Sequence, residues 1–572
     1  MRSHAPSLNR LICLFGTSIA QSSGHIWSTD FDAFPLRNGA RVDKEAFIAF
    51  DMERILVMTF DYLILGAGPA GLQLGYYLER AGYSYQILER GDSAGTSFRK
   101  FPRHRMLISI NKIHTGCEDP ERNMRWDWNS LLTDDYSLLL SDYSKEYFPG
   151  ADALVDYLEG FAAKYVPGIK YGADVTRISR NDEGFHAETA NGRVFSGRCL
   201  IVATGVSKPW SPPIEGIDLA EQYSSVSVDP ADFTNQRVLI IGKGNSAFET
   251  ADNLIGHAAT IHVVGPELLQ FAWQTHYVGH LRAINNNFID TYLLKSQNGI
   301  LDATVERIEK EGEGFRGTVI YHRAADSRSS YYYDRIICCT GFQLDTDIFD
   351  ESCRPEMDLE TADRFPCQNP VWESVNVPDM YFAGTVTQQR DYKKTTSGFI
   401  HGFRYNVRAL FHYLAQRYHD APWPHEVIGQ NDMAPAIISP INHSSALWQQ
   451  FGFLGDVFVL GDETRHYEAV PMDYIREGGL VGDTPYLTVT MEYGSHDFDT
   501  LYDDRVSEHD ADNAADSTAL HPVIRLCRKG EVLAEQHLVE NLEAIWEDSK
   551  LHIEPLGRFI ENLEFSVERT DS

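Results

Sequence analysis

Three glycines near residue 70 carry the clearest chemical signal in the sequence. They occupy residues 66–71 in the spacing G-x-G-x-x-G, directly after the apolar run 62–65. In this pattern the first glycine permits a tight turn, the second lets the backbone approach a pyrophosphate, and the third lets a helix pack closely on the preceding strand. The next apolar run ends in Glu89, 23 residues after Gly66, where a carboxylate can accept a hydrogen bond from a ribose hydroxyl. The residues that we predict to contact this first dinucleotide are Gly66, Gly68, Pro69, Ala70, Gly71, Glu89 and Arg90.

A second turn of the same kind follows the apolar run 237–241. Residues 242–247 fill the related spacing G-x-G-x-x-A, 176 residues after the first turn. Two such modules in one chain favour a flavin held by the first and a nicotinamide held by the second, between which a hydride moves. The predicted cofactors are therefore FAD and either NADH or NADPH. The predicted contacts of the nicotinamide nucleotide are Gly242, Gly244, Asn245, Ser246 and Ala247.

The end of the second module bears on the choice between NADH and NADPH. A 2′-phosphate needs an arginine near the end of the second strand. Glu267 stands there, and no arginine or lysine follows before Arg282. A carboxylate would repel the phosphate, which favours NADH modestly. Lys243, or a loop elsewhere, remains an alternative source of the missing charge.

The elements that must position these residues alternate between strands and helices. We predict a helix over 150–165, strands around Val175 and Phe185, and a further strand that ends at residues 199–205. The fold class is therefore α/β, with two dinucleotide-binding Rossmann-like domains, the second inserted in the first, and a C-terminal α+β module. The expected divisions are 1–57 as an extension, 58–208 and 341–425 as the two parts of the FAD domain, 209–340 as the NAD(P)H domain, and 426–572 as the C-terminal module.

The second part of the FAD domain adds further candidate contacts. An apolar strand over 379–385 ends in small residues, and a helix is expected over 397–414. The positive end of that helix would point at negative charge on a reduced flavin ring, although an ordinary core helix has the same pattern. The additional residues that we predict to contact the cofactors are Val175, Thr204, Gly384, Thr385, Ser397 and Gly398.

Composition restricts the class of partner. The formal net charge of −32 argues against nucleic acid and anionic membrane surfaces as partners. No apolar run approaches the roughly 20 residues of a transmembrane helix. Eight cysteines in 572 residues form no disulfide framework and no C-x-x-C pair, and we predict no metal site. The expected partners are a small-molecule substrate and molecular oxygen, with the oligomeric state left open.

The first 57 residues allow two interpretations. The short apolar run 11–20 could be the core of a signal peptide, or the segment could be an unstructured extension, because Met52 and Met58 would each begin the folded part. We favour the extension and a cytoplasmic protein, with the secretory pathway or ER lumen as the alternative. In a secreted chain, Asn442 would begin a glycosylation sequence.

Longer runs carry a family resemblance. The two glycine turns, with Ala203-Thr-Gly205 between them, resemble those of the flavin-containing (class B) monooxygenases, and the strand 335–342 resembles the second linker of that family. Their fingerprint F-x-G-x-x-x-H is degenerate here, because Gly216 matches but Ala220 replaces the histidine. From about Asp61 onward, other runs are similar to the family of FAD-dependent oxidoreductase domain-containing protein 2, an ER flavoprotein associated with degradation. These runs are residues 107–112, 225–230, 275–286 and 397–405.

The resemblance implies a monooxygenase. NAD(P)H would reduce the FAD, and a peroxide at flavin C4a would transfer one oxygen atom to a small molecule, plausibly in a biosynthetic pathway. By resemblance, Asn111 and the neighbouring Lys112 are the catalytic candidates, although a turn asparagine bonds its own backbone. Arg282 and Asn285 could meet the nicotinamide or a substrate carboxylate, or serve the surface. The alternatives are an oxidoreductase that passes electrons to a protein partner, and a flavoprotein with structural cofactors whose C-terminal module binds partners.

Overall fold

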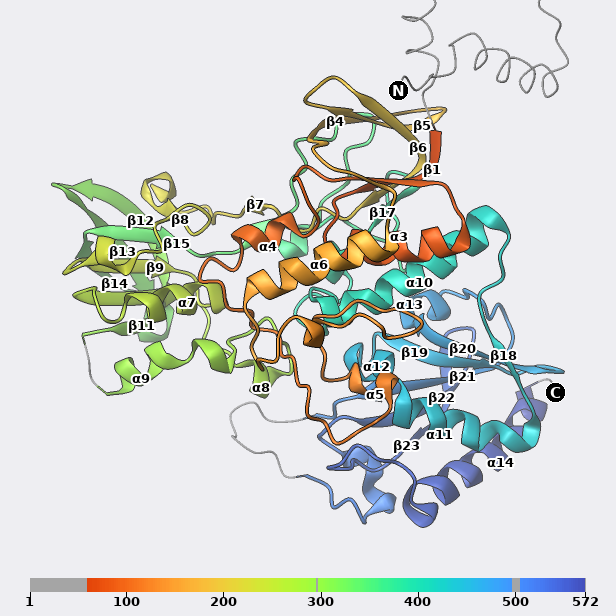
Figure 1. The fold of residues 1–572 in the computed structure, drawn as a ribbon. Coiled ribbons are helices and arrows are strands. Elements are labelled where there is room, and N and C mark those ends of the chain that lie inside the picture. Colours follow the sequence, from red (N-terminus) through yellow and green to blue (C-terminus); the bar gives the residue numbers. More distant parts are fainter. Residues whose placement is uncertain (1–58, 295–296, 496–504, 571–572) are drawn as a thin grey trace, which may run out of the picture. The chain divides into compact units, whose positions relative to one another are not determined.

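The computed structural model describes residues 59–294, 297–495 and 505–570 (Figure 1). These residues belong to one compact unit that begins at Met58. The apolar run 11–20, the two alternative start residues and part of the acidic segment near residue 500 lie outside the described residues. Within the described ranges, none of the helices has the length and apolar character that a membrane crossing requires.

The first Rossmann-like domain is built on a seven-stranded sheet. Its parallel part places β1 (Thr59–Leu65) between β2 (Tyr85–Leu88) and β6 (Val194–Val202), with β3 (Ile169–Lys170) beyond β2. β4 (Val175–Asn181) and β5 (Gly184–Thr189) continue the sheet from β6 as antiparallel strands. A strand from much later in the chain, β17 (Met380–Phe382), also pairs with β6 in parallel. The first domain is therefore completed only after the second one.

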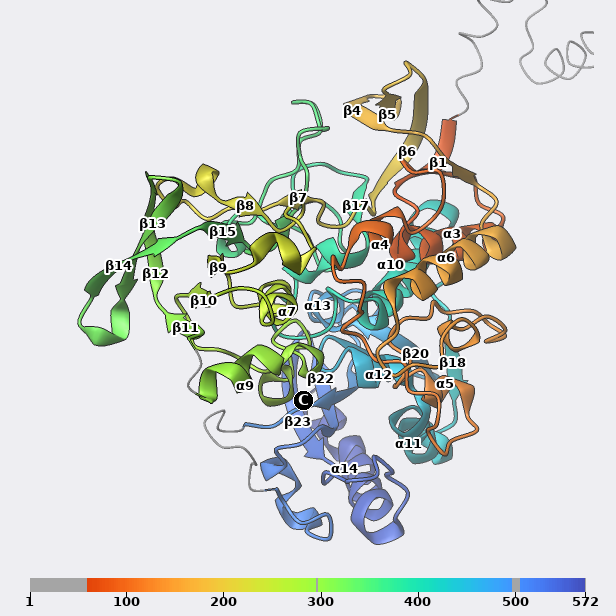
Figure 2. The same cartoon turned by 60° about the vertical axis from the view of Figure 1, so that its left-hand side comes forward.

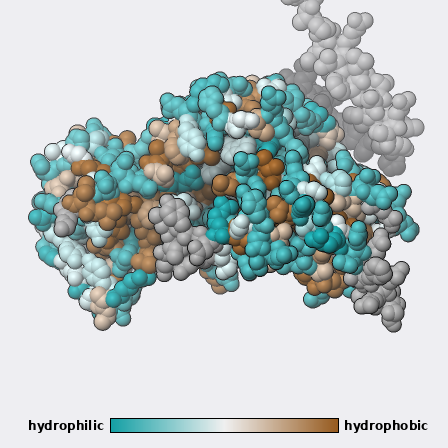
Figure 3. Space-filling model, turned by 90° about the horizontal axis from the view of Figure 1, so that it is seen from below, coloured by the Kyte–Doolittle hydropathy of each residue, from teal (hydrophilic) through white to brown (hydrophobic). Residues whose placement is uncertain are grey.

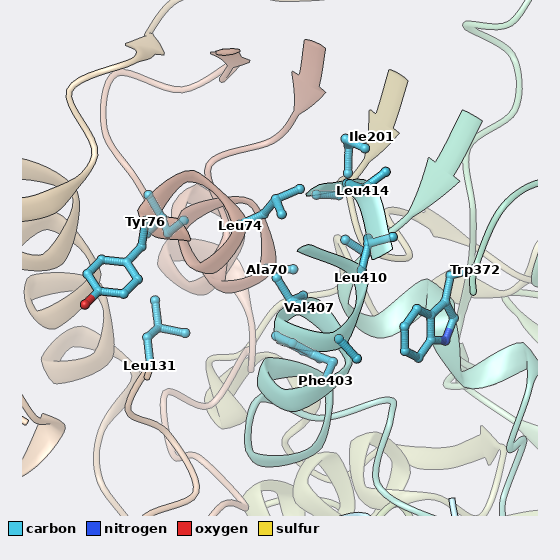
Figure 4. Packing of buried hydrophobic residues seen from close by; sticks show 14 of the residues in the cluster. Ala70, Leu74, Tyr76, Leu131, Ile201, Trp372, Phe403, Val407, Leu410 and Leu414 are labelled. Carbon is cyan, nitrogen blue, oxygen red and sulfur yellow. The ribbon is translucent and has the colours of Figure 1, made fainter. Parts of the chain in front are cut away.

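Helices cover this sheet and form the main core. α3 (Pro69–Ala81) follows β1, and α10 (Ile400–His419) packs beside it. Figure 4 shows Ala70 and Leu74 of α3 facing Phe403, Val407 and Leu410 of α10, and all five side chains are buried. α6 (Ala151–Tyr165) matches the helix predicted over 150–165, whereas α10 begins three residues after the predicted start at Ser397. Ser397 and Gly398 therefore lie in the loop before the helix.

The second Rossmann-like domain is inserted between β6 and β17. Its parallel sheet has the order β11-β10-β9-β15-β8, formed by Gly299–Asp302, Thr260–Gly265, Arg237–Ile241, Arg335–Cys338 and Glu221–Gln222. An antiparallel sheet of β12 (Thr304–Glu311), β13 (Gly314–Tyr321) and β14 (Ser327–Tyr333) follows. The two linkers pair with each other, as β7 (Lys208–Pro209) runs antiparallel to β16 (Phe342–Gln343). The predicted fold class, with one dinucleotide-binding domain inserted in the other, is confirmed.

The C-terminal module is an antiparallel sheet with helices of its own on one face and with α10 and α13 (Met472–Arg476) against part of the other (Figures 1 and 2). Along β21 (Tyr486–Glu492), Leu487, Val489 and Met491 share a buried cluster with residues of α11 (Met433–His443) and α14 (Glu554–Thr570). Asn442 is buried in this module, and its side chain bonds the backbone of Trp546 in both directions. The conditional glycosylation site at Asn442 is therefore inaccessible in the folded chain. The remaining strands of this sheet, in the order β18-β20-β19 before β21 and β22-β23 after it, are Glu426–Ile428, Thr464–Pro471, Leu454–Val459, His521–Arg528 and Glu531–His537.

Both apolar and hydrophilic side chains reach the surface. Figure 3 shows apolar side chains gathered on one part of the face seen from below, with hydrophilic side chains over much of the rest. Several exposed large apolar side chains come from a single segment of the second domain, which includes Trp273, Leu293 and Leu294. The second domain therefore exposes apolar surface near α9 (Asn287–Leu293).

Candidate functional site

The first glycine turn, residues 66–71, leaves room for a pyrophosphate. Gly66 adopts φ +97°, and a Cβ there would lie 2.9 Å from the Ala203 carbonyl oxygen. A Cβ on Gly71 would lie 2.0 Å from the Gly66 carbonyl oxygen, so this glycine allows α3 to pack onto the turn. At Gly68, by contrast, no atom lies within 4 Å of such a Cβ. The turn is closed on the protein side and open at its middle glycine, as approach of a dinucleotide requires.

Glu89 fixes the shape of this turn. Its Oε2 accepts from the Ala67 N–H at 2.8 Å, and its Oε1 accepts from the Gly91 N–H at 2.8 Å. The carboxylate is nearly fully buried at the end of β2, beside the cradle, while Arg90 is exposed. Glu89 thus clamps two turns together, and its contact with a ribose hydroxyl stays a prediction.

The second half of the first domain closes around the same turn. A Cβ on Gly384, which has φ +82°, would lie 2.7 Å from the Cβ of Ala70. The Thr385 hydroxyl donates to the Gly398 carbonyl oxygen at 3.3 Å, which ties the segment after β17 to the loop before α10. Predicted contacts distant in sequence are therefore brought together around Ala70. Thr204 is exposed just after β6, and Val175 is half-buried at the start of β4.

A buried polar network holds the loop before α10. The Ser397 hydroxyl oxygen accepts from Asn406 Nδ2 at 2.9 Å and from Gln450 Nε2 at 3.0 Å. Asp391 is buried nearby, and its Oδ2 accepts from the Ser397 N–H at 3.2 Å and from the Thr395 hydroxyl. Burial raises the pKa of Asp391 to about 6. Gln450 belongs to the C-terminal module, so this module helps to fix the loop.

Several buried polar atoms around this loop have no hydrogen-bond partner among the described residues. His401, in the first turn of α10, is almost fully buried, and neither ring nitrogen is bonded. Its ring stacks on Trp128 with centroids 4.3 Å apart, and burial lowers the pKa of the imidazole well below its usual value. One oxygen each of Gln368, Gln389 and Asp391 is also unpartnered. Buried polar atoms normally find partners, so these orphans and the open turn at Gly68 fit a bound FAD.

The second glycine turn, residues 242–247, repeats the geometry of the first. Gly242 adopts φ +121°, and a Cβ there would lie 2.3 Å from the Cys339 carbonyl oxygen. Gly244 has no atom within 4 Å of an added Cβ, and Ala247 is fully buried. α7 (Asn245–Leu254) begins directly after this open position, so its free N–H groups are available to a phosphate.

The Asn245 side chain organises the segment that covers this turn. Its Nδ2 donates to the carbonyl oxygens of Gly279 and His280 at 3.1 and 2.9 Å. Its Oδ1 accepts from the Arg282 N–H and from Asn285 Nδ2, both at 3.0 Å. Sequence reasoning placed Asn245 on the cofactor and did not anticipate these bonds, because a motif position carries no signal of a partner 40 residues away.

Lys243 lies at the end of β10, where its charge is already paired. Its Nζ donates to the Glu267 carbonyl oxygen at 2.7 Å and pairs with Asp302, and its side chain is about nine-tenths buried. The cation that could have replaced a missing arginine is therefore already paired.

The segment 271–285 of the second domain contacts both the first domain and the C-terminal module. The Tyr277 hydroxyl donates to Gln388 Oε1 at 3.3 Å in the first domain. The Arg282 guanidinium lies over the Trp128 ring, 4.8 Å from its centroid. The His276 ring stacks on Tyr493 of the C-terminal module, with centroids 3.7 Å apart. This segment therefore connects the second glycine turn to the loops around the first.

The two catalytic candidates pair through their backbone with the residues just before Trp128. Asn111 is buried, and its Nδ2 donates to the carbonyl oxygens of Ser144 and Glu146 at 2.9 and 3.3 Å. Lys112 is exposed. Asn111 thus supports a loop of the first domain, and a direct part in the reaction stays a prediction.

Most of the described cysteines are buried. Cys338 and Cys339 are buried at the end of β15, and burial raises the pKa of Cys339. Burial also raises the pKa of Cys353 to about 11. In the described ranges no group of three or more His, Cys, Asp or Glu side chains is arranged to hold a metal ion.

Comparisons with known proteins agree with this geometry. A family profile of the pyridine nucleotide-disulphide oxidoreductases matches residues 63–384. FAD-dependent oxidoreductase domain-containing protein 2 of Danio rerio is 36% identical over 88% of this chain and 83% of its own, and the same protein of Mus musculus is 37% identical over 88% and 84%. Indole-3-pyruvate monooxygenase YUCCA1 of Oryza sativa subsp. japonica is 26% identical over 42% of this chain and 58% of its own.

Proposed function

The chain belongs to the family of FAD-dependent oxidoreductase domain-containing protein 2 and to the pyridine nucleotide-disulphide oxidoreductases, and from this premise we propose that it oxidises a reduced nicotinamide nucleotide and oxygenates a small molecule. The observation that carries the proposal is the pair of open glycine turns at Gly68 and Gly244, joined by the segment 271–285. Family membership makes the chain an FAD-dependent oxidoreductase. The identity of its electron donor and of its electron acceptor is what we propose.

The first turn, Glu89 and the loop before α10 would hold FAD. When bound, FAD supplies hydride acceptance from the nicotinamide and electron delivery to an acceptor. The chain's own part is to position both cofactors and to exclude water from the space between them. The positive end of α10, a helix of 20 residues, would stabilise negative charge near the loop at Ser397 and Gly398.

Asp391 can hold a proton beside this loop. Its pKa of about 6 lies near neutral pH, because burial disfavours its charged form. Its Oδ1 has no partner among the described residues, while Oδ2 is fixed by the Ser397 N–H. A carboxyl group with one anchored and one unpartnered oxygen suits proton exchange with a neighbouring group.

We infer that NADH is the preferred reductant. Glu267 follows β10 at the position where a 2′-phosphate needs a cation, and Lys243 is already paired with Asp302. A phosphate placed there would meet the Glu267 carboxylate. The Lys243 ammonium group would not balance it, because it is already paired with Asp302.

Oxygen is the favoured acceptor, and a protein partner is the alternative. Burial raises the pKa of the Cys339 and Cys353 thiols, which disfavours the thiolates needed for disulfide exchange. The likeness to a monooxygenase of rice supports oxygen transfer but covers only 42% of the chain. The similarity to the two oxidoreductases extends over 88% of the chain, and their name states no acceptor, so a protein acceptor stays the alternative.

The test begins with a matched pair of variants. Gly68→Ala and Gly244→Ala each add one methyl group into open space, so both should fold. We expect Gly68→Ala to weaken FAD binding about tenfold, and Gly244→Ala to retain FAD while losing about tenfold in NADH affinity. Anaerobic reduction of the flavin by NADH and by NADPH, followed by absorbance, reports both effects. Equal reduction of the two variants by NADH would contradict the assignment of the turns.

The acceptor is then identified with isotopically heavy oxygen gas. The reduced protein is mixed with this gas and a panel of indoles, amines, thioethers and carbonyl compounds. One heavy oxygen atom in a product, measured by mass spectrometry, establishes oxygenation. Full conversion of the NADH electrons to hydrogen peroxide, with no labelled product, would move the proposal to the protein acceptor.

A further inference from the structure

A pocket of about 410 Å³ lies where the C-terminal module meets the first domain. Ligand pockets commonly measure roughly 300 to 1,000 Å³ and favour domain interfaces. Its wall includes Lys394 and Thr395 from the loop before α10, and Phe451, Tyr486 and Tyr493 from the C-terminal module. This pocket has no place in the proposed reaction.

One face of β21 forms the floor of the pocket. Successive side chains of a strand point to opposite faces, and here Tyr486, Thr488, Thr490 and Glu492 face the pocket while the alternate residues pack on the helices. The neighbouring strand β22 (His521–Arg528) adds Cys527 opposite Tyr486 and Arg525 opposite Thr488. The sheet thus buries one apolar face against its own helices and turns hydroxyl-bearing and charged residues toward the cavity.

The pocket touches both cofactor-bearing parts of the chain. Thr395 lines it, and the hydroxyl of this residue also bonds Asp391 in the loop before α10. Tyr493 lines it as well, and its ring stacks on His276 of the segment that covers the second glycine turn. A molecule bound in the pocket would therefore contact residues bonded to each of the two sites.

The rim of the pocket has an excess of positive charge. Arg476 lines the rim and shares one carboxylate, Asp473, with Arg390, at 2.8 and 2.5 Å. Lys394 also lines the pocket and forms no ion pair with any described residue. Among the residues that line the pocket, the three cations Lys394, Arg476 and Arg525 accompany one acid, Glu492, in a chain whose formal net charge is −32. Arg525 on the floor is already paired with both Glu492 and Glu535, so the cations available to a ligand are Lys394 and Arg476 at the rim.

Apolar side chains make up part of the pocket lining. Met472 and Ile475 of α13 (Met472–Arg476) and the rings of Phe451 and Tyr486 supply them. A ligand that fits would place an apolar body against these side chains and an anionic group at Lys394 and Arg476.

We propose that this pocket is a binding site for a small organic anion with an apolar, ring-bearing body, such as an aromatic carboxylate or sulfonate. The site is separate from the two glycine turns. It gives the C-terminal module a ligand-binding role that stands whether or not the chain oxygenates a substrate.

The test uses two fluorescent probes that differ only in charge. 8-Anilinonaphthalene-1-sulfonate carries a sulfonate, and N-phenyl-1-naphthylamine has the same rings without it. Each is titrated into the full chain loaded with FAD and saturated with NAD⁺, so that the glycine turns are occupied. The variants are Lys394→Gln and Arg476→Gln at the rim, and Val532→Trp, which fills the pocket from a half-exposed position on its wall. Lys170→Gln, an exposed lysine in β3, is the control.

We expect one saturable site for the sulfonate probe. Each rim variant should weaken its binding about threefold and leave the uncharged probe unchanged, because only the charged probe meets the cations. Val532→Trp should weaken both probes about tenfold, and Lys170→Gln neither. Unchanged sulfonate binding in Val532→Trp, or equal affinity of the two probes in the parent protein, would overturn the proposal.

Discussion

Replacing Glu249 by glutamine is expected to change how the stability of the protein depends on pH. Glu249 lies in α7, directly behind the second glycine turn, and its Oε1 accepts from the Tyr223 hydroxyl. Burial raises the pKa of Glu249 from its ordinary 4.5 to about 7. Glutamine keeps an oxygen acceptor for Tyr223 and removes the charge.

The size of the effect follows from the pKa shift. A folded-state pKa above the unfolded one means that the folded protein binds the proton more tightly, so stability falls as pH rises from about 4.5 to about 7. The rise of this pKa from 4.5 to about 7 corresponds to about 3 kcal/mol, since a tenfold change in proton affinity is worth about 1.36 kcal/mol. The loss is complete above the folded pKa and absent below the unfolded one.

Urea unfolding at several pH values between 4.5 and 8.5 measures this difference. The free energy of unfolding of Glu249→Gln, minus that of the parent, should increase by about 3 kcal/mol across the range. Glu477→Gln, which alters an exposed glutamate, is the matched control and should give parallel curves. Parallel curves for Glu249→Gln as well would refute the argument that burial holds the proton on this carboxyl group.

Three further predictions test the packing around the sites. Gly71→Ala should displace α3 and lower both the melting temperature and FAD binding, because its Cβ would lie 2.0 Å from the Gly66 carbonyl oxygen; circular dichroism melts and FAD titration measure this. Asn245→Asp cannot donate to the two carbonyl groups of residues 279–280, so it should weaken NADH binding about tenfold with FAD binding unchanged in the same titrations. Trp546→Ala should cost about 3 to 5 kcal/mol in urea unfolding, because the ring is fully buried in the C-terminal module.

The sequence predicted the two Rossmann-like domains because their signals are local. A glycine turn, the apolar strand before it and the helix after it occupy about 20 consecutive residues, and β1 with α3 appears where the spacing placed it. The match at Gly216 has a different basis. This glycine has φ +77°, and a Cβ there would lie 2.1 Å from the Ile308 carbonyl oxygen, so packing against β12 requires it. Packing therefore requires a glycine at residue 216 regardless of whether the fingerprint histidine or Ala220 stands four residues later.

The parts that sequence reasoning missed depend on contacts between distant residues. Asn111 is a catalytic candidate by resemblance, and that resemblance does not predict the bonds of its amide to carbonyl groups more than 30 residues away. The orphaned nitrogens of His401 follow from its burial beside Trp128, which no spacing in the sequence reveals. The predicted start of α10 at Ser397 is three residues too early, and the Ser397 hydroxyl is instead bonded to Asn406 and Gln450.

The bonds of Gln450 suggest why the C-terminal module accompanies the other two domains. Its amide reaches Ser397 and Asn406, inside the first domain, and the module also stacks Tyr493 on His276 of the second domain. A buried amide that lost these partners would carry the full cost of desolvation, about 1 to 3 kcal/mol for each unsatisfied group. Removal of the module would therefore leave Ser397 and Asn406 partly unsatisfied in the loop before α10. The module is in this sense a structural part of the candidate flavin site as well as a separate fold.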